Sequence, residues 1–146
     1  MFELGSDGPL IIVAGIDGSN TSMRAGAYAW GLARRQGAKV VFAYIRPLGI
    51  GSPTVGAAMA QVGRDLADDL ERQIREGVER SPVGHRARWE FHSGEGDAYR
   101  GLVELSDRLR ADAVVIGAST KAGHHFLGSV AVRLVKAGRW PVTVVP

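Results

Sequence analysis

The chain alternates between short, continuous apolar runs and longer stretches in which apolar residues recur at helical spacing. The short runs predict buried strands at 10–16, 39–45, 112–118 and 141–145. The longer stretches predict helices at 19–37, about 57–78, 97–109 and 129–138. Residues at the boundaries agree with these helices, because Ser19 or Asn20 suits a helix start and Gly37 and Gly138 suit helix ends.

One further segment, 87–93, has a different pattern. Ala87, Trp89 and Phe91 alternate with polar residues, which is the period of a strand that has one apolar face and one polar face. We therefore expect this strand at an edge of the sheet. His92, on the polar side of the alternation, and His85 just before the segment are expected at the surface.

Strands and helices follow one another as β-α-β-α-β-α-β-α-β. This order predicts an α/β fold, with a parallel sheet covered by helices on both faces. Ligands of such sheets bind beyond the carboxyl ends of the strands, where the winding reverses direction. If the reversal lies between the first and fourth strands, then Asp17 and the pair Gly128-Ser129 face each other across one cleft.

Each of these residues also has a purely structural interpretation. Asp17 before Gly18 fits either a turn or helix cap or a ligand contact. Gly117 could serve only to let a loop pack closely on a strand. Gly128-Ser129 is a good helix start by itself, but the same helix start presents free N–H groups that suit a phosphate.

Composition and charge narrow the class of protein. The 146 residues predict one domain spanning 1–146, and the absence of cysteine excludes a disulfide framework or a thiolate zinc site. No apolar run approaches the roughly 20 residues that span a bilayer, and the first residues do not resemble a signal peptide, so we expect a cytoplasmic protein without a membrane partner.

The last residues of the chain are basic, since 118–146 contain Lys121, Arg133, Lys136 and Arg139 but no acid. Such a face could attract an anion, or it could be ordinary solvated surface. Nucleic acid is an unfavoured partner, because aromatic residues are not interleaved with these cations.

Signatures of common enzymes are absent from the sequence. It contains no P-loop, no dinucleotide-binding glycine fingerprint after the first strand and no serine-nucleophile elbow. Adjacent His124 and His125 make a poor metal pair, and no metal site is predicted. No catalytic residue is predicted, because Asp17 is the one acid placed near the expected cleft.

Four segments together resemble the universal stress protein family. They are "IIVAGIDGSNTS", "SGEGDAYRGLVELSDRLRADAVVIGAS", "LGSVAVRLV" and "WPVTVVP". The resemblance implies a single-domain, flavodoxin-like sandwich that binds adenine nucleotides in some members, with a five-stranded parallel sheet in the order 3-2-1-4-5. It also implies a homodimer that pairs through the last strand.

Family members that bind ATP resemble one another in a loop that has a glycine, two residues, a second glycine, nine residues and then Gly-Ser or Gly-Thr. Gly117 matches the first glycine, but Thr120 replaces the second, and only seven residues separate it from Gly128. Ala131 stands where a hydroxyl residue is usual. All three departures fall on the phosphate side, so the loop resembles a degenerate ATP site.

The resemblance assigns nucleotide contacts to a set of positions around the cleft. These are Asp17, Gly18, Ile45, Ile116, Gly117, Thr120, Gly128, Ser129 and Val130.

Three functions remain open at this point. The first is a stress-response domain that binds ATP, AMP or an anion weakly, with Mg²⁺ only if ATP binds. The second is a dimeric regulatory protein of the same family that does not bind ATP, and the third is a slow ATPase.

Overall fold

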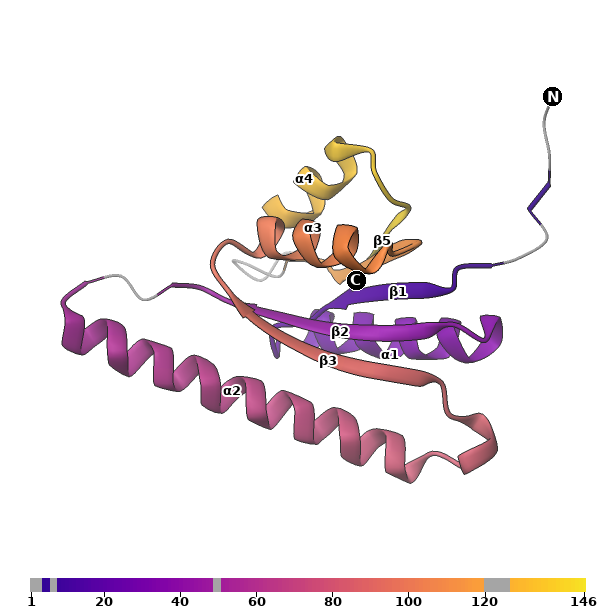
Figure 1. Cartoon of the computed structure of the whole chain (residues 1–146), viewed down its shortest axis with the longest axis horizontal. Helices are drawn as coiled ribbons and strands as arrows, with labels where there is room; N and C mark the ends of the chain where they lie inside the picture. The colour runs from indigo at the N-terminus through magenta and orange to yellow at the C-terminus, as the bar shows by residue number, and fades with distance from the viewer. Residues whose placement is uncertain (1–3, 6–7, 49–50, 120–126) are drawn as a thin grey trace.

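The computed structural model describes residues 4–5, 8–48, 51–119 and 127–146. Its strands form one parallel sheet (Figure 1). Their order is β3-β2-β1-β4-β5, which confirms the predicted order 3-2-1-4-5. All four neighbouring pairs run parallel. The strands are β1 (Ile11–Gly15), β2 (Lys39–Arg46), β3 (Arg88–Glu95), β4 (Ala113–Gly117) and β5 (Val142–Val145).

Helices cover both faces of this sheet, as predicted (Figure 1). Buried residues of α1 and α2 join the core on one face, and buried residues of α3 and α4 join the core on the other. The two cores meet at the central strands, where Ile12 and Val13 of β1 point to opposite faces and are both fully buried. The helices are α1 (Asn20–Gln36), α2 (Pro53–Arg80), α3 (Ala98–Leu109) and α4 (Ser129–Ala137).

Local sequence explains where the helices begin and end. The side chains of Ser19, Ser52 and Asp97 each accept a hydrogen bond from a backbone N–H in the first turn of α1, α2 and α3. Gly37 and Gly138 end α1 and α4 in the left-handed conformation that a glycine adopts without steric cost. The sequence patterns missed a short 3₁₀ helix, η1 (Val83–His85), because three residues are too few to show a period.

The alternating segment forms β3, which lies at an edge of the sheet as predicted. Trp89 and Phe91 are half-buried against the core, whereas Arg88 and Glu90 are exposed. The expectation that both histidines lie at the surface holds for His85, but His92 is half-buried. Burial lowers the pKa of His92 below its ordinary value of 6.5, and the nearby Arg108 guanidinium lowers it further.

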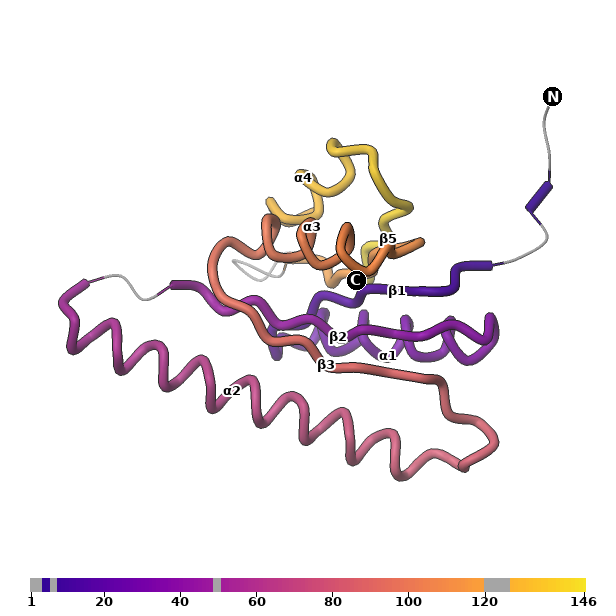
Figure 2. Tube along the Cα trace, viewed as in Figure 1, coloured from indigo at the N-terminus to yellow at the C-terminus, as the bar shows by residue number. Residues whose placement is uncertain are grey.

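The long helix α2 begins earlier than its periodicity suggested. Its apolar stripe reaches the core through Leu66, Leu70 and Ile74, but Val62 is 66% exposed. The first turns of α2 extend beyond the ends of the strands, so this part of the stripe has no sheet beneath it (Figures 1 and 2).

Two of the cations in the acid-free C-terminal region have carboxylate partners from α3. Arg133 lies 3.3 Å from Asp97, and Arg139 lies 2.5 Å from Asp107. A region without acids in sequence is therefore partly neutralised in space. In the portion of the chain that the structure describes, no helix has the combination of length and apolar character needed to cross a membrane.

Candidate functional site

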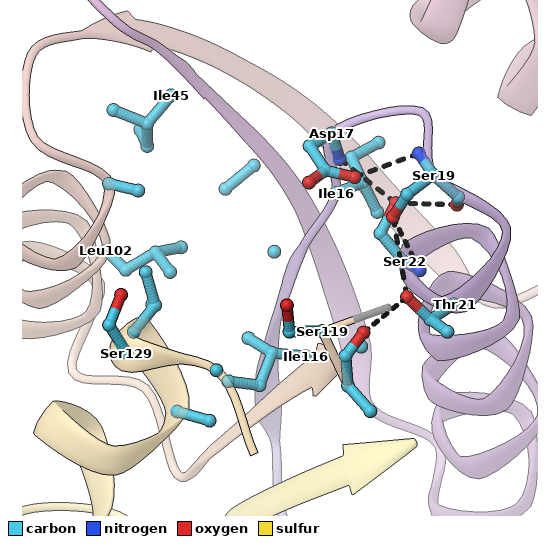
Figure 3. Close-up of a pocket in the computed structure, with 18 residues that line it drawn as sticks. Ile16, Asp17, Ser19, Thr21, Ser22, Ile45, Leu102, Ile116, Ser119 and Ser129 are labelled. Carbon is cyan, nitrogen blue, oxygen red and sulfur yellow. Dashed lines mark hydrogen bonds between the residues drawn. The ribbon is translucent and has the colours of Figure 1, made fainter. Parts of the chain in front are cut away.

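A cleft of about 560 Å³ opens at the carboxyl ends of β1 and β4, where the order of the strands reverses. This is the position at which parallel α/β sheets bind their ligands. Its volume lies within the range of ligand pockets, roughly 300–1,000 Å³. Figure 3 shows a polar wall made by the start of α1, facing a wall to which Ile45, Leu102 and Ser129 contribute.

The polar wall is held by hydrogen bonds among its own residues (Figure 3). The Asp17 carboxylate accepts from the Ser19 backbone N–H at 2.9 Å, and the backbone N–H of Asp17 donates to Ser22 Oγ at 3.1 Å. Ser22 Oγ in turn donates to the carbonyl of Ser19 at 3.0 Å. The buried hydroxyl of Thr21 donates to the carbonyl of Ala118 at 2.6 Å, which joins α1 to the end of β4.

The Asp17 carboxylate stays ionised in this wall. Partial burial acts to raise its pKa, but hydrogen bonds from Ser19 and Ser22 outweigh the burial and bring the pKa below the ordinary 3.8. An ionised carboxylate accepts hydrogen bonds and donates none. Asp17 therefore suits a ligand hydroxyl or amine, and it repels a phosphate.

Gly117, at the end of β4, lies against the first turn of α1. A Cβ atom at this position would lie 2.5 Å from the carbonyl carbon of Thr21 and 2.6 Å from the backbone nitrogen of Ser22. These atoms belong to the backbone and cannot turn aside. Close packing of strand and helix is therefore enough to require glycine here, whether or not a ligand binds.

Ile45 and Leu102 form an apolar part of the opposite wall. The position of Ile45 depends on two glycines, because a Cβ at Gly101 would lie 2.9 Å from three of its side-chain atoms and one at Gly94 would lie 3.2 Å from its Cδ1. The glycines let α3 and β3 approach Ile45 closely. The result is a fixed apolar surface beside the polar wall.

The N-terminus of α4 closes the remaining side of the cleft. Gly128 is the N-cap of this helix, and no side chain among the described residues caps it. The first N–H groups of a helix have no acceptor within the helix, so those of Ser129, Val130 and Ala131 are available to an anion. The 3.3 Å ion pair between Arg133 and Asp97 ties α4 to the start of α3 and fixes the position of this end.

Most of the predicted site residues meet in this cleft. Asp17, Ile45, Ile116, Gly117, Gly128, Ser129 and Val130 line it. Gly18 is not among the lining residues; its φ of 86° turns the chain from β1 into α1, against Leu66 and Leu70. Thr120 lies outside the described residues, as do Lys121, His124 and His125.

The sequence interpretation missed several residues of the cleft. Ser19, Thr21 and Ser22 line it, whereas the sequence pattern predicts a role only for Ser19, as a helix cap. The hydroxyl-rich run "SNTS" directly after Asp17-Gly18 was the available signal. Ala98, Leu102 and Ser119 also contribute, but nothing in their local pattern separates them from ordinary helix or loop positions.

Comparison with known proteins places the chain in a family. The model of the universal stress protein family matches residues 10–146. The chain belongs to the universal stress protein family. Universal stress protein MJ0531 of Methanocaldococcus jannaschii is 30% identical over 140 residues, which cover 92% of this chain and 80% of the relative.

Solved structures of family members show the same fold. Universal stress protein UspA from Lactobacillus plantarum is similar with a TM-score of 0.81 at 17% identity, covering 94% of this chain and 97% of its own. A universal stress protein in complex with cAMP has a TM-score of 0.61 at 24% identity, with 94% and 96% covered. A family protein from Arabidopsis thaliana with AMP bound has a TM-score of 0.58 at 17% identity, with 94% and 91% covered.

Proposed function

We propose that this universal stress protein binds an adenine nucleotide weakly in the cleft between β1 and β4, and that it prefers AMP to ATP. One observation carries the proposal: the two sides of the cleft differ in charge. One wall holds the carboxylate of Asp17, and another side is formed by the uncapped start of α4. The family structures with AMP and with cAMP support the choice of an adenine nucleotide.

The residues present fit the three parts of such a ligand. The apolar surface of Ile45 and Leu102 suits an adenine ring, because a flat base gains by leaving water against apolar side chains. The ionised carboxylate of Asp17 suits the hydroxyls of a ribose, to which it would act as acceptor. The N–H groups at the start of α4 suit a phosphate, and Ser129 would add a hydroxyl donor.

The preference for a monophosphate follows from the loop sequence. Relative to the pattern of ATP-binding members, the second glycine is replaced by Thr120 and the loop is two residues shorter before Gly128. Threonine is β-branched and resists the left-handed backbone that a glycine allows. These changes affect the far phosphates of ATP and leave the adenine and ribose surfaces intact. Magnesium would enter only with ATP.

Calorimetry with AMP, ADP and ATP tests the proposal. We expect AMP to bind at least as tightly as ATP, and ATP to bind no more tightly than micromolar. Asp17→Ala and Ser129→Ala should each weaken AMP, since they remove contacts to different parts of the ligand. Asp68→Ala is the matched control, because Asp68 is an exposed acid on α2 outside the cleft.

Three results would contradict this function. The first is nanomolar affinity for ATP, which would mean that the shortened loop still holds a triphosphate. The second is AMP binding that is unchanged in the double variant Asp17→Ala, Ser129→Ala. The third is a folded wild type that binds none of the three nucleotides, which would leave the dimeric regulatory role without nucleotide.

We also propose that two copies of the chain pair through β5. Among the described strands β5 has a neighbour on one side only, and all four of its residues are half-buried. A short, apolar, β-branched edge such as this is a template for association with another chain. Val135 of α4, which is 54% exposed, adds apolar surface that a partner could cover.

Sedimentation at micromolar concentration tests the pairing. The wild type should sediment as a dimer, and Val144→Lys should give monomer or insoluble protein, because a lysine on the edge discourages strand pairing. Trp89→Lys would damage the core, so a fairer control on the opposite edge strand is Ser93→Lys, at an exposed and uncharged position. A monomeric wild type would overturn this part of the proposal.

A further inference from the structure

A second polar hollow lies at the opposite end of α1 from the cleft. It has a volume of about 430 Å³ and is formed by the last turns of α1 together with η1 and its flanking residue. Figure 1 shows η1 beyond the end of the sheet where α1 ends, away from the start of α4. We call it the arginine hollow; its lining residues are Gly31, Arg34, Arg35, Gly84, His85 and Arg86.

The guanidinium group of Arg34 is held by an uncharged acceptor, the imidazole ring of His85. Its Nη2 lies 3.0 Å from Nδ1 of His85. A guanidinium can only donate hydrogen bonds, so Nδ1 of His85 must accept. This contact fixes the direction of Arg34 without bringing a negative charge to it.

Arg86 is also held by uncharged acceptors, in this case backbone carbonyl groups. Its Nε donates to the carbonyl of Ser81 at 3.0 Å, and its Nη2 donates to the carbonyl of Glu79 at 2.9 Å. These bonds attach Arg86 to the C-terminal end of α2 and use one edge of its guanidinium group. The other nitrogen, Nη1, makes no hydrogen bond within the described part of the chain.

The third arginine is Arg35, which has neither a hydrogen bond nor an ion pair among the described residues. None of the residues that line the arginine hollow is acidic. Three positive charges therefore gather in one hollow without a negative charge in its lining.

Two of the residues that line the arginine hollow are glycines, Gly31 and Gly84. A Cβ atom at Gly31 or at Gly84 would meet no atom within 4 Å. Both positions therefore face open space, and a Cβ added at either would meet no steric clash. Access to the arginines is unobstructed at these two positions.

We propose that the arginine hollow is a binding site for an oligophosphate, a linear anion with two or more linked phosphate groups. Arginine pairs with phosphate through parallel hydrogen bonds, and two of the three guanidinium groups are already oriented by neutral partners. Three charges spread over one hollow match several linked phosphates better than a single one. The site is separate from the cleft, since the 17 residues of α1 place the two ends about 25 Å apart.

Paired substitutions at Gly31 test the site without removing any arginine. Gly31→Glu would place a carboxylate one turn before Arg34 and Arg35, whereas Gly31→Gln has nearly the same shape and no charge. We expect calorimetry with inorganic tripolyphosphate to show at least tenfold weaker binding for Gly31→Glu and wild-type binding for Gly31→Gln. Both variants should fold, because glycine is a weak residue inside a helix and this position is open.

A control for net charge is available on α2. A Cβ at Gly56 also meets no atom within 4 Å, and Gly56→Glu makes the same charge change far from the hollow. Equal weakening by Gly56→Glu and Gly31→Glu would overturn the proposal, because the effect would then be one of total charge. Wild-type affinity in Gly31→Glu would overturn it as well.

Two further measurements identify the ligand class and the position. Tripolyphosphate should bind at least tenfold more tightly than orthophosphate, and equal affinities would overturn the assignment to an oligophosphate. Arg35→Gln should weaken tripolyphosphate, whereas Ser129→Ala in the cleft should not. The reverse pattern would mean that the anion binds at α4, and the arginine hollow would lose its role.

Discussion

The two helices that begin at the cleft differ in how their first turns are satisfied. At α1, Ser19 caps the helix, Ser22 bonds back to Ser19, and Thr21 bonds across to Ala118. At α4, the cap is Gly128, and no described side chain accepts from the first turn. The polar groups at the start of α1 are therefore satisfied by the protein's own side chains. The start of α4 presents its N–H donors to the cleft.

This difference separates residues that build the cleft from residues that are available to a ligand. Gly117 and Gly128 both belong to the family loop pattern, yet a Cβ at Gly117 would meet backbone at 2.5 Å, and one at Gly128 would meet the Ser119 side chain at 3.1 Å. The first glycine is required by the contact between β4 and α1. The second has a looser contact, with a side-chain atom in place of backbone, and it leaves donors unused.

The strongest test of the comparison is to add one methyl group at each glycine. Gly117→Ala should lower the free energy of unfolding by about 3 kcal/mol or more, because backbone atoms of α1 must move. Gly128→Ala should cost about 1 kcal/mol or less, since Ser119 can shift by a few tenths of an ångström. Urea unfolding of both variants measures this, and equal losses would contradict the distinction.

A second test removes the hydroxyl that joins α1 to β4. Thr21→Val keeps the shape of the buried side chain but leaves the carbonyl of Ala118 without its 2.6 Å donor. We expect a loss of about 1–3 kcal/mol in the free energy of unfolding. Thr21→Ser retains the hydroxyl and should lose less. A Thr21→Val protein as stable as the wild type would mean that this bond does not hold the wall.

A third test uses pH to probe Asp17 in the polar wall. The pKa of Asp17 is lower in the folded chain than its ordinary 3.8, so its carboxylate stabilises the fold above that value, and the stabilisation is lost as the pH falls through the folded pKa. Asp17→Asn should therefore lose less stability than the wild type between pH 5 and pH 2. Parallel acid-unfolding curves for the two proteins would contradict the hydrogen-bonded state of Asp17.

The smallest effect on stability is expected at the open helix start. Ser129 is exposed and caps nothing, so Ser129→Ala should change the free energy of unfolding by no more than about 0.5 kcal/mol. Its AMP affinity should nevertheless fall several-fold, as the proposed function requires. Thermal unfolding and calorimetry on the same sample separate the two effects. A large loss of stability would mean that Ser129 supports the fold, as the residues of the polar wall do.

Much of the fold could be predicted from the sequence, because each element carries its own period. The alternation at Trp89 and Phe91 identified the edge strand, and the continuous apolar runs identified the central strands. The limit of burial along α2 was not predicted, since Val62 continues the apolar stripe although no sheet lies beneath it. A helical period predicts where a helix forms, but it does not predict how much of that helix is buried against the sheet.

The candidate site was less accessible to sequence reasoning. Asp17 and Gly128 could be placed on one cleft, because they follow strands whose order fixes where they meet. The bond from Thr21 to Ala118 joins residues 97 positions apart, and no local pattern shows it. The arginine hollow escaped notice for the same reason, since Arg34 and His85 come together only after α2 has returned the chain to the end of α1.

The contact of Gly117 with Thr21 and Ser22 has a consequence for genetic screens of this protein. A screen for loss of function will recover substitutions at Gly117 as severe alleles even if the assay never depends on a ligand, because such chains fail before they reach any function. Alleles at Ser129 will be silent in the same screen unless nucleotide matters to the phenotype. The informative alleles are therefore the mild ones at the start of α4.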